Sequence, residues 1–163
     1  MKTKTYTVYK FNELSEEAKQ KAIENLYDIN VDHDWWEFTY EDAEQIGIKI
    51  TGFNIDRGSY CKGDFIESPL TVIKLIKENH GESCETYKTA LKYEKLILEC
   101  PKDEEGEPIE NELEVIEDDF RNSLLEDYRI MLEKEYDYLT SKKAIIETIE
   151  SNDYDFTSEG KLD

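Results

Sequence analysis

Residues 110–139, ENELEVIEDDFRNSLLEDYRIMLEKEYDYL, decide the fold. Apolar residues recur in this stretch every third or fourth position, which is the period of one face of an α-helix. The apolar stripe consists of Leu113, Ile116, Phe120, Leu124, Tyr128, Met131, Leu132, Tyr136 and Leu139. Neither glycine nor proline interrupts it, whereas the preceding loop PKDEEGEP is bracketed by Pro101 and Pro108. The spacing therefore predicts one long helix over about residues 110–139.

Shorter helices are predicted on both sides of this long one. Ser68 followed by Pro69 matches the preferred N-cap and first position of a helix, and Gly81 follows at its expected end. A second helix covers about residues 83–99, with an apolar side formed by Cys84, Tyr87, Leu91 and Leu98. After the long helix, Ser141 starts a short one. The second half of the chain is therefore mainly helical.

Strand patterns occupy much of the first part of the chain. Residues 3–11 alternate between two faces and are rich in β-branched and aromatic side chains. Residues 48–56 also alternate, and Gly52 interrupts the alternation where a β-bulge is expected. The turn Arg57–Gly58–Ser59 leads into residues 60–66, the expected antiparallel partner strand. We expect these segments to form one small antiparallel sheet of three strands.

Two helices are predicted between these strands. One is capped by Asn12 or Ser15, and the other covers about residues 34–45 before Gly47. At the far end of the chain, an alternation of Tyr154 and Phe156 adds a further candidate strand.

The order of elements predicts an α+β fold with a small antiparallel sheet near the N-terminus and a mainly helical C-terminal half. A length of 163 residues predicts a single domain over residues 1–163. Within it, residues 1–67 form the strand and helix part. Residues 68–163 form the mainly helical part, with an acidic loop over residues 101–110.

Composition sets limits on the partners of this protein. Forty acidic and twenty basic residues give a net charge of −20, which disfavours tight binding to free nucleic acid, because phosphates are neutralised by Lys and Arg. An aromatic content of 12% argues against a disordered acidic tail. No apolar run reaches the roughly 18 residues of a membrane span, and no signal peptide is expected at the start. The three cysteines, Cys61, Cys84 and Cys100, are expected to be reduced. We therefore expect a cytoplasmic protein with a basic partner and no membrane contact.

The acidic residues are concentrated in the segment from Asp103 to Asp119, hereafter the acidic segment. It holds ten carboxylates and no basic residue: Asp103, Glu104, Glu105, Glu107, Glu110, Glu112, Glu114, Glu117, Asp118 and Asp119. If the segment were all helix, these would be spaced by roughly 2.6 Å, against about 1.7 Å per phosphate along a DNA duplex. Glu126 and Asp127 continue the charge along the predicted helix. The segment is either a surface that fits a groove made for phosphates or a solvated helix face.

The other candidate functional residues can also be explained by structural roles. Asp32, His33 and Asp34 contain metal-ligand types, but a helix N-cap explains the same residues, so we expect no metal. Trp35 and Trp36 cannot both face one core on a helix, so Trp35 is either a partner contact or has a capping or edge-packing role. His80 precedes Gly81 at a helix end, where its charge complements the helix dipole. No nucleophile elbow or phosphate-binding loop is present, so we expect neither an enzyme nor a cofactor.

Several longer stretches resemble a known group of proteins. They are YTVYKFNELSEEAKQKAIENL, DHDWWEFTYEDAEQIGIKITGFNIDRGSYCKGDF, HGESCETYKTA, LLEDYRIMLEKEYDYL and IETIESNDYDFTSEGKL. Together they resemble a family of small acidic proteins of bacteriophages and mobile elements that is labelled antitoxin-like. The resemblance implies an inhibitor of host defence in the bacterial cytoplasm, in concrete form an anti-CRISPR protein. Its partner would be a basic CRISPR effector nuclease, and the alternative is an antitoxin or regulatory module that neutralises a basic toxin.

Overall fold

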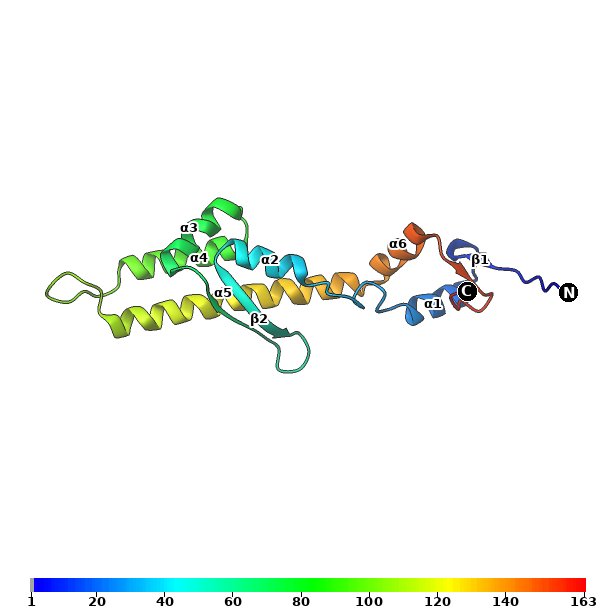
Figure 1. The fold of residues 1–163 in the computed structure, drawn as a ribbon, viewed down its shortest axis with the longest axis horizontal. Coiled ribbons are helices and arrows are strands. Elements are labelled where there is room, and N and C mark those ends of the chain that lie inside the picture. Colours follow the sequence, from blue (N-terminus) through cyan, green and yellow to red (C-terminus); the bar gives the residue numbers. More distant parts are fainter. Residues whose placement is uncertain (1) are drawn as a thin grey trace. The chain divides into compact units, whose positions relative to one another are not determined.

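A computed structural model describes residues 2–163 and confirms the α+β class, with six α-helices and short antiparallel strands (Figure 1). The chain forms two compact units. The central unit is Trp36–Glu133, and the terminal unit combines the chain up to Trp35 with Lys134–Asp163. This division does not follow the boundary near residue 67, because both chain ends contribute to one unit. Folding of the whole chain as one domain stays a prediction.

The central unit contains a β-hairpin and four helical segments. They are α2 (Glu37–Gln45), β2 (Ile48–Asn54), β3 (Tyr60–Phe65), α3 (Pro69–Asn79), α4 (Glu85–Leu98) and the first part of α5 (Glu110–Leu139). The helices α4 and α5 are joined by a loop and pack side by side (Figure 1), with the rings of Tyr93 and Phe120 stacked 5.3 Å apart. The same core contains five residues with no exposed surface: Ile48, Val72, Ile76, Leu124 and Tyr128. The predicted helix over residues 110–139 is confirmed.

The β2–β3 hairpin contains the bulge that the sequence predicted. Ile50 pairs with Gly63 and Gly52 pairs with Lys62, so Thr51 has no opposite residue. Gly63 is required on the partner strand, because a Cβ atom there would collide with the backbone oxygen of Lys49. The close backbone approach and the bulge therefore occur at the same point of the hairpin.

The serines predicted as helix caps accept hydrogen bonds from the first turn of their helices. Ser68 accepts from the backbone N–H of Thr71, with Pro69 next to it, and Ser141 accepts from that of Ala144. Of the alternatives Asn12 and Ser15, the cap is Ser15. The helix predicted from about residue 34 begins only at Glu37, because Trp35 and Trp36 lie in the turn before it.

The terminal unit is assembled from both ends of the chain. Strand β1 (Tyr9–Lys10) leads through a short 3₁₀ helix (Phe11–Glu13) into α1 (Glu16–Asn25), and α6 (Lys142–Asn152) leads into β4 (Asp155–Phe156). The two strands pair antiparallel with Tyr9 opposite Phe156. Their shared core is Phe11, Leu14, Ala18, Ala22, Ile23, Ile145, Ile149 and Phe156. The candidate strand at the C-terminal end is thus confirmed.

The predicted three-stranded sheet is wrong. The structure has two separate two-stranded sheets, β1 with β4 and β2 with β3. The first strand is also shorter than its alternation suggested, since only Tyr9 and Lys10 are paired and the residues from 2 to 8 are exposed. Alternation predicts a strand but does not choose its partner. Pairing of β1 with β4 is stabilised by the ring contact of Phe11 with Phe156 and by the ion pair of Lys10 with Asp155, 2.7 Å long.

Candidate functional site

The acidic segment begins in an ordered turn at the tip of the α4–α5 hairpin (Figure 1). The backbone N–H of Asp103 donates to the carbonyl of Glu107 over 2.8 Å. Its side-chain Oδ1 accepts from the backbone N–H groups of Glu105 and Glu107 at 2.9 and 3.0 Å. Gly106 supplies the positive φ of 83° that this turn needs. The carboxylates of this loop are therefore presented on a hydrogen-bonded turn that continues into α5.

The carboxylates of the acidic segment are largely exposed and uncompensated. Eight of the ten are exposed, and only Glu117 and Asp118 are half-buried. Across residues 2–163, the one ion pair made by this set joins Asp118 to Arg121 at 3.4 Å. Partial burial, together with the charges of Asp118 and Glu114, raises the pKa of Glu117. Nine carboxylates thus project a negative field without an internal counterion.

Glu126 and Asp127, expected to extend this surface, are engaged within the central unit. The Oε atoms of Glu126 accept from Arg129 at 2.7 and 2.9 Å. Asp127 accepts from the hydroxyl of Thr89 on α4 at 2.6 Å and is half-buried, and burial raises its pKa. Asp127 therefore helps to join α4 to α5, and Glu126 carries a charge that is locally neutralised.

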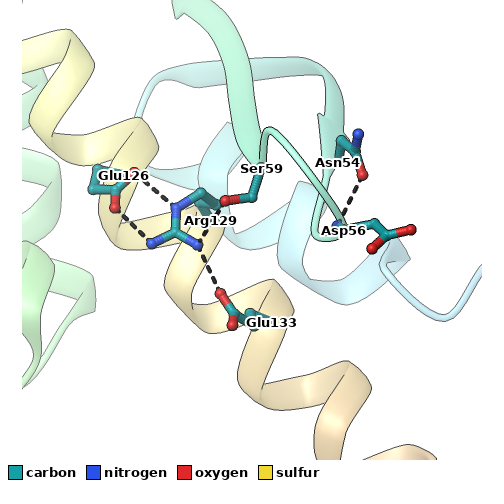
Figure 2. Close-up of polar contacts among 6 residues, drawn as sticks. All are labelled: Asn54, Asp56, Ser59, Glu126, Arg129 and Glu133. Atoms are coloured by element: carbon teal, nitrogen blue, oxygen red, sulfur yellow. Dashed lines mark hydrogen bonds and ion pairs between the residues drawn. The ribbon is translucent and has the colours of Figure 1, made fainter.

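Arg129 links α5 to the turn of the β2–β3 hairpin, as Figure 2 shows. Its guanidinium donates to Glu126 and Glu133 on the same helix and reaches the hydroxyl of Ser59 over 3.3 Å. The hydrogen bonds to the two carboxylates raise its pKa further. In the same turn, Oδ1 of Asn54 accepts from the backbone N–H of Asp56 at 2.9 Å. This arrangement has a structural role, because its charges satisfy one another.

The two tryptophans pack against different aromatic rings. Trp35 is half-buried in the terminal unit, with its ring 5.6 Å from that of Tyr136. Trp36 is half-buried in the central unit, 5.6 Å from the ring of Phe53. Trp35 thus has the edge-packing contact that was its alternative interpretation, and a partner contact there stays a prediction.

The structure also reveals a polar network that sequence reasoning missed. His80 ends α3, and its side chain is only 8% exposed. Its Nδ1 lies 2.5 Å from the hydroxyl oxygen of the fully buried Thr86, and its Nε2 lies 3.0 Å from Oδ2 of Asp42. The buried hydroxyl of Tyr128 donates to the same Asp42 oxygen over 2.8 Å. Four elements of the central unit meet in this network. His80 is 38 residues from Asp42 in the sequence and Tyr128 is 86 residues from it, so no local sequence pattern could predict these contacts.

The ionisation of Asp42 follows from the geometry of this network. The Nε2 atom of His80 lies within hydrogen-bond distance of Asp42, and its Nδ1 atom lies within hydrogen-bond distance of the Thr86 hydroxyl. Burial acts to raise the pKa of Asp42, but hydrogen bonds from His80 and Tyr128 outweigh it and lower the pKa below its usual 3.8. Burial and the neighbouring Asp42 carboxylate raise the pKa of Tyr128. The network therefore holds one ionised carboxylate at neutral pH.

A groove of about 310 Å³ lies over this network in the central unit. Its lining includes Phe38, Thr39, Cys84 and Met131, together with Asp42 and His80 of the network. We call it the Asp42 groove. Both ring nitrogens of His80 are occupied and the Thr86 hydroxyl is buried, so these residues form a support for Asp42 rather than a base and its nucleophile.

Among residues 2–163, no group of three or more His, Cys, Asp or Glu side chains is placed to hold a metal ion. Within the same residues, no helix has the length and apolarity needed to cross a bilayer. No family model matches the sequence, and no curated protein or solved structure is significantly similar to it.

Proposed function

We propose that this protein is an anti-defence inhibitor of the anti-CRISPR type. In this proposal, the acidic segment binds the basic channel of a nucleic-acid-guided bacterial nuclease and interferes with its guide or target nucleic acid. The observation that carries the proposal is the set of nine carboxylates without an internal ion pair, among residues 2–163, on an ordered turn and the start of α5. A fold normally avoids such uncompensated charge unless it has a use, because like charges repel.

The charge spacing supports a phosphate-like surface. Only residues 110–119 of the segment are helical, and they carry six of its carboxylates. At about 1.5 Å per residue these ten residues rise roughly 15 Å, or one carboxylate per roughly 2.5 Å. This spacing is close to the roughly 1.7 Å per phosphate of a DNA duplex. The remaining four carboxylates lie on the turn before the helix.

The test is a DNA-cleavage assay with a panel of guide-loaded CRISPR effector nucleases of different types. We expect the wild-type protein to inhibit at least one of them at near-stoichiometric concentration. A variant with Glu104, Glu105, Glu107 and Glu114 changed to Lys reverses exposed charges that make no ion pair in residues 2–163. Loss of electrostatic steering is expected to slow its association with that nuclease about ten-fold or more.

The matched control changes four exposed acids outside the segment, Glu135, Asp137, Glu150 and Glu159, to Lys. Both variants change the net charge equally, so a smaller effect of the control assigns binding to the acidic segment. Equal effects would show that only net charge matters. No inhibition of any nuclease in the panel would overturn the proposed function, and rescue of cells from a basic toxin would then favour the antitoxin alternative.

A further inference from the structure

The Asp42 groove combines an ionised carboxylate with apolar walls. Phe38 and Asp42 lie four residues apart on α2, so they share one face of that helix. The Phe38 side chain is 84% exposed, which is unusual for an aromatic ring of this size. Met131 of α5 and Cys84 before α4 complete the apolar part of the lining. The groove is therefore suited to a side chain that is apolar along its length and positively charged at its end.

Asp42 is fixed in position and still accessible. His80 and Tyr128 hold it by hydrogen bonds of 2.8 to 3.1 Å, and its side chain is 41% exposed. A carboxylate has about four lone-pair positions, so these two donors leave acceptor capacity on the exposed side. Across residues 2–163, no Lys or Arg side chain forms an ion pair with Asp42.

We propose that the Asp42 groove receives an arginine side chain of the basic partner protein. The guanidinium would donate to the exposed side of Asp42 and lie over the ring of Phe38. Arginine fits better than lysine, because its planar group stacks on aromatic rings and is less strongly hydrated. This inference rests on the proposed function, since it assumes a basic partner, and it adds a second, more specific contact to the electrostatic one.

The test uses a small probe in place of the partner. N-acetyl-arginine methylamide is titrated into the 163-residue protein labelled with ¹³C-methyl methionine. The sequence has two methionines, Met1 and Met131, so the Met131 methyl resonance can be followed. We expect a saturable shift of the Met131 methyl resonance with a Kd of roughly 1–10 mM, the range of a single charged contact. The citrulline analogue has nearly the same shape but no charge, and it should give no saturable shift. The lysine analogue should bind more weakly than arginine.

Two variants locate the binding. Phe38→Ala removes an exposed ring, so it should leave the fold intact and weaken arginine binding at least three-fold. Tyr27→Ala, an exposed ring of the terminal unit, is the matched control and should bind like wild type. An unsaturable Met131 shift, an equal response to citrulline, or unchanged binding by Phe38→Ala would overturn the groove assignment.

The outcome is separable from that of the nuclease assay. The arginine titration contains no partner protein, so a negative titration beside intact nuclease inhibition would overturn only the groove. Arginine binding beside absent nuclease inhibition would overturn only the proposed target.

Discussion

The carboxylate of Asp42 depends on donors that belong to other elements of the central unit. Tyr128 comes from α5 and His80 from the end of α3, while Thr86 orients the His80 ring from the first turn of α4. Each of these polar groups would be costly to bury alone, because an unpaired buried donor or acceptor loses its hydrogen bonds to water. The network therefore fixes how the elements pack as well as the position of one charge.

Removal of one donor at the residue scale should be measurable as lost stability. Tyr128→Phe keeps the buried ring but removes the hydroxyl that donates to Asp42. Hydrogen bonds to charged groups contribute about 1.5–3 kcal/mol, so we expect the free energy of unfolding in urea to fall by this amount. Tyr138→Phe is the control, because Tyr138 is half exposed and the hydrogen bond from its hydroxyl to Glu147 is 3.4 Å long. A loss for Tyr128→Phe no larger than for this control would contradict the assigned role.

Two aspartates in the central unit should respond to acid in opposite directions. The pKa of Asp42 is lowered in the folded state, so its stabilising effect is present above its unfolded pKa and is lost as pH falls through the folded pKa. The pKa of Asp127 is raised by burial, so its protonation favours the folded state as pH falls. Relative to Asp42→Asn, wild type should lose stability between about pH 5 and pH 2. Relative to Asp127→Asn, wild type should gain stability over the same range. The measurement is the free energy of unfolding across this pH range, and a change in the same direction against both variants would contradict the assignments.

At the scale of elements, one face of α5 is buried in the core of the central unit. Phe120 of α5 has no exposed surface and contacts the rings of Tyr93 and Phe65. Phe120→Ala should therefore lower the free energy of unfolding by about 3–5 kcal/mol, through lost burial and the cavity left behind. Val115→Ala, on the exposed side of the same helix, should cost less than about 0.5 kcal/mol. A loss below about 1 kcal/mol for Phe120→Ala would mean that the buried face of α5 is misplaced.

Local patterns predicted the elements well because their causes are local. The stripe over residues 110–139, the cap at Ser68 and the bulge near Gly52 each depend on residues close in sequence. Pairing of β1 with β4 depends on residues almost a chain length apart, so the alternation at Tyr9 could not reveal it.

The same contrast applies to the candidate sites. The acidic segment is contiguous and was visible in the sequence, whereas Asp42, His80 and Tyr128 meet only after folding. Sequence reasoning placed His80 at a helix end, where the structure also has it, but did not identify its partners. The exposure of Phe38 near Asp42 could not be predicted either, since the sequence shows only that the two residues are four positions apart on a helix.

At the scale of the whole molecule, charge is distributed unequally. Residues 36–133 hold 25 acidic and 11 basic side chains, a net charge of −14, whereas the terminal unit holds 15 and 9, a net charge of −6. The central unit thus carries most of the negative charge and also both proposed contacts, the acidic segment and the Asp42 groove.

This charge predicts the behaviour of the protein toward bare nucleic acid. We expect no binding to free DNA or RNA at physiological salt in gel-shift titrations up to micromolar protein, because few phosphates could be neutralised. Sub-micromolar binding would contradict this expectation and would direct attention to a basic patch, with Lys88, Lys92 and Lys95 on α4 as the first candidates.

The pairing of β1 with β4 has a consequence for synthesis on the ribosome. Tyr9 and Lys10 of the first strand are made before the central unit, whereas their partners Asp155 and Phe156 are made after it. The central unit contains no residue after Glu133 and can fold while the chain is still being extended. The strand and the apolar face of α1 therefore stay unpaired until α6 and β4 have been made. Ribosome-bound chains ending before residue 155 should therefore expose the N-terminal segment to proteases or chaperones that the released protein excludes.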